Sequence, residues 1–289
     1  MEFRRWLLFF GAACLFALSG CSKDEKQVSL QEIEPGSVYT GEINLPLPEA
    51  SGTEVYEGSG VTVDASHAED GYIMVKCTGA TARLKVRIVL GDEEYTYDLN
   101  QKGEYEVFPL QMGNGDYEVT VFQNIEGTKY SPLYQTALSV TMPDEDRVFL
   151  FPSQYVWYTN EESAVKLSYD LCEGLETDKQ KVGRIYDYLV WLLEYDYEKA
   201  ATVESGYIPD LSEILQIKKG ICFDYAALMA AMLRAQDIPV RLVIGYVQPD
   251  NLYHAWNQVY MDGAWVWMDA TFGPDSTRKE ADYTQDRRY

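Results

Sequence analysis

GICFDYAALMAAMLR, residues 220–234, and HAWNQVYMDGAWVWMD, residues 254–269, are the two stretches that decide the fold of the C-terminal half. The first stretch is apolar on nearly every face from Ala226 to Ala235, which predicts a buried helix. The helix begins at Cys222, where unpaired backbone N–H groups and the positive end of the helix dipole favour a thiolate. Taken alone, such a cysteine is more often a packed core residue than a nucleophile.

The second stretch predicts a β-hairpin with a two-residue Asp-Gly turn at positions 262–263. Met261 then pairs with Ala264, and His254 and Asp269 become diagonal neighbours on one face of the hairpin. Their backbones would lie about 7 to 8 Å apart, within reach of a hydrogen bond from imidazole to carboxylate. The opposite face is apolar from 255 to 270, apart from one asparagine, and is predicted to face the core.

A thiol at a helix start and a histidine oriented by an aspartate follow the logic of a nucleophile–base–orienter triad. In chain order the motifs resemble the core of the transglutaminase-like superfamily. The motifs are Gly220-x-Cys222-x-Asp224-Tyr225-Ala226, His254-Ala255-Trp256-Asn257, Trp265 and Asp269. The resemblance implies a papain-like α+β domain, for which we expect residues 146–289.

The same resemblance assigns Cys222 as nucleophile, His254 as base and acid, and Asp269 as the residue that orients His254. The backbone N–H of Cys222 would hold the oxyanion, and Gln216 is suspected as a second donor because some family members use an upstream side chain. The sequence thus predicts a cysteine hydrolase or transamidase that cleaves peptide or carboxamide bonds through an acyl-enzyme. Whether water or an amine accepts the acyl group is left open.

Composition excludes several other kinds of chemistry. The 289 residues carry a formal net charge of −22, which repels phosphate backbones, so no nucleic-acid partner is expected. Only His67 and His254 are available as imidazoles, and the cysteines form no C-x-x-C pair. The usual ligand spacings of a zinc site are therefore missing, and we expect neither a metal nor a cofactor.

The N-terminus is typical of an exported bacterial lipoprotein. Two arginines precede an apolar stretch, Trp6–Leu18, that is too short to span a bilayer comfortably. Leu18-Ser19-Gly20-Cys21 resembles a lipobox, so residues 1–20 are predicted as the signal peptide and Cys21 as the lipidated residue. A small-residue cleavage site with a chance cysteine is the alternative. The lipid would anchor the protein to the outer face of the cell membrane.

Residues 21–57 are rich in Glu, Gly, Pro and Ser and are predicted to form a flexible tether. From 58 to 145 apolar residues recur at every second position between turn signals, which favours an antiparallel β-sandwich of immunoglobulin-like type. Beyond Pro143 the period becomes helical, with helices expected near 164–172 and 178–195, the second after a capping box at Thr177. The end of the chain, 273–289, is interpreted as a polar tail.

Three points stay open at this level. Cys77 and Cys172 are interpreted as inert buried thiols, with a disulfide between them as the alternative. The substrate is expected to be a peptide or protein, with cell-wall peptides among the candidates. The alternative function is a catalytically silent surface-binding lipoprotein that recognises a partner through its sandwich domain.

Overall fold

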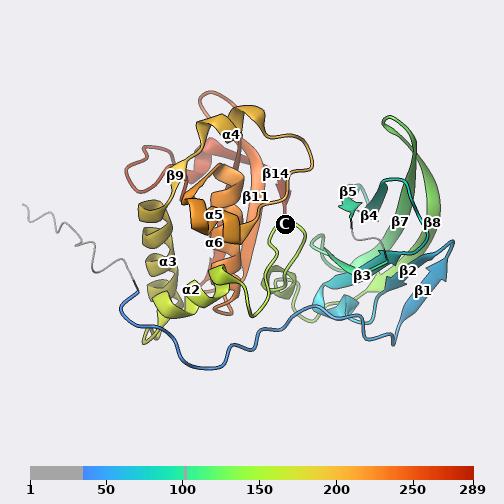
Figure 1. The fold of residues 1–289 in the computed structure, drawn as a ribbon, viewed down its shortest axis with the longest axis horizontal. Helices are drawn as coiled ribbons and strands as arrows, with labels where there is room; N and C mark the ends of the chain where they lie inside the picture. Colours follow the sequence, from blue (N-terminus) through green and yellow to red (C-terminus); the bar gives the residue numbers. More distant parts are fainter. Residues whose placement is uncertain (1–34, 101–102) are drawn as a thin grey trace, which may run out of the picture.

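A computed structural model describes residues 35–100 and 103–289, which form two domains. The N-terminal domain consists of strands, and the C-terminal domain combines helices with a sheet (Figure 1). The predicted signal peptide and Cys21 lie outside the described residues. In the part of the chain that is described, no helix has the length and apolar character needed to cross a membrane.

The N-terminal domain is built from two four-stranded antiparallel sheets that share one apolar core. Alternation places every second side chain inside, as at Val86 and Ile88, both fully buried. One sheet has the order β1 (Val55–Gly58), β2 (Val61–Asp64), β3 (Tyr72–Cys77), β6 (Glu106–Pro109). The other has the order β5 (Glu93–Leu99), β4 (Leu84–Leu90), β7 (Gly115–Glu126), β8 (Lys129–Val140). The immunoglobulin-like assignment of this domain stays a prediction.

The segment before the sandwich differs from a free tether. Strand β1 begins at Val55, three residues inside the segment predicted to be flexible. Residues 35–54 form no helix or strand but run along both domains (Figure 1). The backbone N–H of Tyr39 donates to Asp170 at 2.6 Å, and that of Leu45 donates to Asn160 at 3.0 Å. Ile43 and Leu45 pack on the core of the C-terminal domain, which explains why this stretch lies against it.

The C-terminal domain contains five helices and an antiparallel sheet, with one helix buried at its centre, in agreement with the predicted α+β class. The helices are α2 (Ser163–Cys172), α3 (Asp178–Leu192), α4 (Tyr197–Thr202), α5 (Leu211–Ile217) and the central α6 (Cys222–Arg234). The sheet has the order β13 (Ala264–Met268), β12 (Leu252–Met261), β11 (Val240–Val247), β14 (Tyr283–Arg288). A short parallel pair joins β9 (Glu194–Tyr195) to β10 (Lys219–Gly220).

The helix boundaries follow the sequence signals with two shifts. Thr177 and Gln180 form the predicted capping box of α3, but this helix ends at Leu192 because Tyr195 pairs in β9. Helix α2 begins after Glu162, whose side chain makes no capping hydrogen bond, and the side chain of nearby Asn160 accepts from Leu45 in the segment before the sandwich.

The interpretation of residues 273–289 as a polar tail is wrong. Residues 283–288 form β14, which pairs with β11 and completes the sheet. At the end of this strand Tyr289 packs its ring against Tyr95, Tyr97 and Tyr155, so the C-terminus lies at the junction of the two domains (Figure 1). The strand was missed because YTQDRR lacks the apolar alternation that marks a half-buried strand.

Cys77 and Cys172, for which the sequence allows either a disulfide or two thiols, are free, buried thiols. Cys77 lies on β3 of the sandwich, and Cys172 is the last residue of α2 in the other domain. Burial raises the pKa of both thiols, that of Cys172 to about 11. Both therefore stay protonated at neutral pH and are poor nucleophiles.

Candidate active site

Cys222 is the first residue of α6 and is partly exposed. Its backbone N–H lies in the first helical turn, where no intrahelical acceptor exists. The helix start is fixed by Asp224, whose Oδ2 accepts the backbone N–H of Ile221 at 2.9 Å. The nucleophile candidate therefore sits on a rigid helix end with free donors beside it.

Asp224 is fully buried and organises the surroundings of this helix end. Its carboxylate also accepts from Lys199 Nζ at 2.7 Å and from the Tyr207 hydroxyl at 2.7 Å. Lys199 in turn donates to the Tyr207 oxygen at 2.6 Å. Asp224 therefore connects α4 and the loop before α5 to the start of α6, which is a structural role.

A steric reason explains why the motif has a glycine at position 220. A Cβ on Gly220 would lie 2.7 Å from the Cβ of Asp224, closer than two carbon atoms that are not bonded to each other can approach. We expect Gly220→Ala to lower the free energy of unfolding by roughly 1 to 3 kcal/mol, because Asp224 must shift. Gly183→Ala is the matched control: a Cβ at Gly183, in the middle of α3, meets nothing within 4 Å.

Urea unfolding followed by circular dichroism measures both glycine variants. The control should be more stable than the parent chain by roughly 0.5 to 1 kcal/mol, the usual gain from Gly to Ala inside a helix. Equal stability of the two variants would show that the space beside Asp224 is not limiting.

The hairpin brings His254 and Asp269 together. Strands β12 and β13 pair from Asn257 opposite Met268 to Met261 opposite Ala264, the register that the turn predicts. His254 Nε2 lies 2.8 Å from Oδ2 of Asp269, which follows directly after β13. Both side chains are almost completely buried, so water cannot compete for the hydrogen bond.

The apolar face of the hairpin is buried in only part of its length. Ala255 and Val259 lie in the core beside α6, and the amide of Asn257 donates to the Ala226 carbonyl of that helix at 3.0 Å. Ala264 and Val266 are exposed, contrary to expectation, because β13 is the edge strand of the sheet. Strand β12 therefore makes the contacts with the core, and the edge strand β13 ends directly before Asp269.

Asp269 is held by four donors. Oδ1 accepts the backbone N–H groups of Thr271 at 2.9 Å and Phe272 at 3.4 Å. Oδ2 accepts from His254 and from the hydroxyl of Tyr283 at 2.7 Å. Tyr283 belongs to β14, and no sequence pattern pointed to it because the strand itself is not predicted from the sequence. The carboxylate is therefore oriented from two sides before it meets the imidazole.

The electrostatic surroundings of His254 favour the imidazolium. Burial by itself lowers the pKa of His254, but the hydrogen bonds and charges of Asp269 and Cys222 outweigh it and raise that pKa to about 9. Since Nε2 is engaged by Asp269, the interaction with the Cys222 thiol falls to Nδ1. The ring is kept in its plane by Phe272, which stacks on it at 4.6 Å.

A second hydroxyl, that of Tyr195, lies next to the thiol. The β9–β10 pairing sets Tyr195 opposite Gly220, two residues before Cys222. Burial and the interaction with Cys222 raise the pKa of Tyr195 to about 12, so its hydroxyl stays protonated and able to donate. Gln216, the donor suspected from the sequence, is exposed on α5. The tyrosine was missed because strand pairing, not sequence spacing, brings it to the site.

We expect Tyr283→Phe to lower the rate of Cys222 acylation by an activated ester about tenfold, since Asp269 loses one of the donors that orient it. The pH profile of the rate should shift as well, because Asp269 then interacts more strongly with His254. Tyr260→Phe is the control: this ring lies on β12 and packs on Trp265 at 5.3 Å. A Tyr283→Phe chain with the parent rate and profile would contradict a positioning role.

The three predicted site residues come from separate elements of the C-terminal domain. Among residues 35–100 and 103–289, no three or more His, Cys, Asp or Glu side chains are grouped so as to hold a metal ion. Cys222, His254 and Asp269 come from α6, β12 and the end of β13, and the structure brings all three predicted site residues to one place.

Comparisons with known proteins place the same segment in a family. Residues 165–270, which contain all three site residues, match the model of the transglutaminase-like superfamily. Human kyphoscoliosis peptidase is 26% identical over 148 residues, which cover 47% of this chain and 22% of that protein. The UPF0252 protein MJ1282 of Methanocaldococcus jannaschii is 31% identical over 121 residues, 37% of this chain and 33% of that protein. The chain thus spans a third or less of the length of these relatives.

A similar solved structure comes from Cytophaga hutchinsonii and is provisionally described as a cysteine protease. It is 20% identical, with a TM-score of 0.43, and the match covers 75% of this chain and 83% of that one.

Proposed function

Because residues 165–270 form a domain of the transglutaminase-like superfamily, we propose that the protein is a cysteine hydrolase or transamidase that acts on peptide or carboxamide bonds. The observation that carries the proposal is the position of His254, hydrogen-bonded to Asp269 on one side and interacting with the Cys222 thiol on the other. This is the arrangement in which a histidine activates a nucleophile and is itself oriented by a third group.

In the first half of the reaction, the Cys222 sulfur attacks the carbonyl carbon of the amide. The oxyanion that forms is held by the backbone N–H of Cys222 and by the hydroxyl of Tyr195. His254 donates its proton to the amide nitrogen, the C–N bond breaks, and the amine leaves. The acyl group remains on Cys222 as a thioester.

In the second half, His254 is neutral and takes a proton from the incoming nucleophile. Water yields a carboxylic acid and a primary amine yields a new amide, and in both cases the thiol of Cys222 is released. Throughout, Asp269 holds the imidazole with Nδ1 towards the thiol, since its Oδ2 keeps the proton on Nε2.

For the cellular setting we propose an exported lipoprotein, held by lipid on Cys21 at the outer face of a bacterial cell membrane. The support is the charged start, the short apolar stretch and the lipobox-like residues 18–21. A peptide or protein substrate outside the cytoplasm fits this setting, and cell-wall peptides belong to that class.

The acyl-enzyme is the intermediate to detect. The chain without its first 22 residues keeps every described element and can be mixed with p-nitrophenyl acetate, quenched in acid and measured by intact mass. We expect one added acetyl group, mapped to Cys222 and missing in Cys222→Ala. Release of that group with and without an added primary amine then separates hydrolysis from transamidation. A chain that is never acylated at Cys222 would favour the silent surface-binding lipoprotein.

A further inference from the structure

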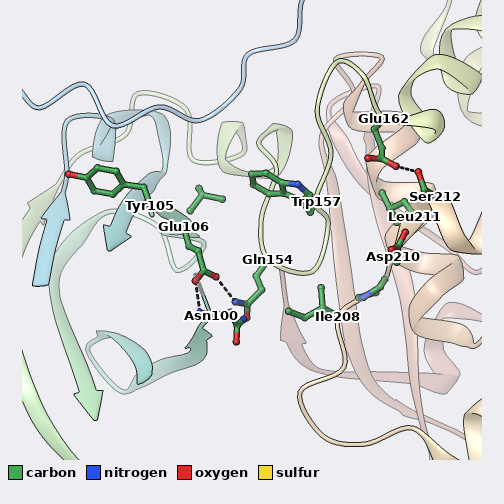
Figure 2. Close-up of a pocket in the computed structure, with 12 residues that line it drawn as sticks. Asn100, Tyr105, Glu106, Gln154, Trp157, Glu162, Ile208, Asp210, Leu211 and Ser212 are labelled. Carbon is green, nitrogen blue, oxygen red and sulfur yellow. Dashed lines mark hydrogen bonds between the residues drawn. The ribbon is translucent and has the colours of Figure 1, made fainter. Parts of the chain in front are cut away.

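A cleft of about 550 Å³ lies between the two domains and is not part of the site described above. Figure 2 shows its walls: Tyr105 and Glu106 belong to the sandwich, whereas Ile208, Asp210 and Ser212 belong to the C-terminal domain. Trp157, from the segment between the domains, stands between these walls. A cavity of this size holds a few amino-acid side chains rather than a single ion.

The cleft presents apolar surface that the fold leaves exposed. Trp157 is 47% exposed and Ile208 is 36% exposed. The sandwich wall is attached to the segment that carries the tryptophan, because Gln154 donates to the Asp98 carbonyl at 2.7 Å and to Glu106 at 3.3 Å. An exposed indole in a fixed cleft is a binding surface for an aliphatic chain or a cation.

The negative charge on the wall formed by the C-terminal domain indicates which kind of side chain the cleft binds. Glu162 accepts from the Ser212 hydroxyl, and Asp210 accepts the backbone N–H of Glu213 at 2.9 Å, so both carboxylates are hydrogen-bonded to neutral donors. Within the described part of the chain, the lining of the cleft contains no lysine or arginine. Two negative charges beside an exposed indole are complementary to a side chain with an alkyl stem and a cationic head.

Two residues next in sequence to the cleft lining contact the start of α6, the helix that begins with the nucleophile. Ile208 follows Tyr207, whose hydroxyl binds Asp224 in the first turn of α6. Gln154 precedes Tyr155, whose ring packs at 5.5 Å on Phe223, the residue after Cys222. The walls of the cleft are therefore connected, through Tyr207 and Tyr155, to the first turn of α6.

Resting on the function proposed above, we propose that the interdomain cleft binds a lysine or arginine side chain of the peptide substrate. The indole of Trp157 packs on the alkyl stem, and Glu162 and Asp210 face the cationic head. The sandwich domain thereby takes part in substrate selection, because it supplies one wall of the cleft.

Equilibrium binding tests this without any turnover. Two fluorescein-labelled decapeptides, identical except for Lys-Ala-Lys or Glu-Ala-Glu at the centre, are titrated with the Cys222→Ala chain and followed by fluorescence anisotropy. We expect the lysine peptide to bind more tightly than the glutamate peptide, and less tightly as salt is raised.

The cleft variant is Glu162→Gln/Asp210→Asn, which removes both charges but keeps acceptors for Ser212 and for the start of α5. We expect its affinity for the lysine peptide to fall about tenfold, as for two ion pairs lost. Trp157→Ala should also weaken binding. The control Asp116→Asn/Glu126→Gln removes two exposed carboxylates of β7 in the sandwich and should bind as the parent does.

Equal binding of both peptides, or equal loss in the cleft and control variants, would overturn the proposal. So would unchanged binding of the lysine peptide by both the charge variant and Trp157→Ala. The binding measurement uses a chain without the thiol, so a negative binding result says nothing about whether Cys222 can be acylated. In the same way, a negative acylation result does not change the binding result.

Discussion

Asp269→Asn should lower the rate of Cys222 acylation about a thousandfold or more, nearly as much as Asp269→Ala. The reason lies in the donors around the carboxylate. Oδ1 already accepts two backbone N–H groups, from Thr271 and Phe272, so the single oxygen of an asparagine would be held there. Its NH2 group would then face His254 Nε2, which must become an acceptor.

That tautomer carries its proton on Nδ1, the nitrogen that has to accept the proton of the thiol. The same kind of tautomer error, in an aspartate-to-asparagine variant of a serine protease, costs about four orders of magnitude in rate. Stopped-flow acylation by p-nitrophenyl acetate measures the effect, and circular dichroism checks the fold. An asparagine variant with near-parent activity would show that the tautomer is not set by Asp269.

Asp224→Ala should cause the largest loss of stability of any single change at this site, about 3 to 5 kcal/mol, as expected when one partner of a buried ion pair is removed. The side chain is fully buried and accepts from Ile221, Lys199 and Tyr207. Without it, the ammonium group of Lys199 and the backbone N–H of Ile221, the residue before α6, lose their acceptor together.

Lys199→Met with Asp224→Asn is the informative comparison. It removes both charges and keeps one acceptor for the helix start, so it should recover much of the stability lost in Asp224→Ala. Urea unfolding at neutral pH measures all three chains. If the single alanine variant unfolds at the parent urea concentration, the carboxylate does not hold the start of α6.

The sequence predicted the three site residues, but not the tyrosines that contact them. The Asp-Gly turn fixed the hairpin register, and with it the distance between His254 and Asp269, because a two-residue turn allows only one pairing. The glycine and the apolar run located the start of α6 at Cys222 for the same local reasons. These features depend on residues close together in sequence.

The tyrosines were missed because their positions depend on long-range pairing. Tyr283 reaches Asp269 from β14, a strand of polar residues that forms only because β11 offers it a free edge. Tyr195 reaches the thiol through the two-residue β9–β10 pair. Both tyrosines are ordinary residues in sequence, and only the tertiary structure gives them partners.

The most direct test of the account is the rate of Cys222 alkylation by iodoacetamide as a function of pH, measured by intact mass and peptide mapping in the parent chain and in His254→Ala. The pKa of His254 is raised to about 9, so its positive charge persists below that pH and supports the thiolate. We expect the parent rate to stay high below neutral pH and to collapse in the variant. A rate that falls like that of a free thiol near pH 8.5, unchanged by His254→Ala, would contradict a working cysteine–histidine pair.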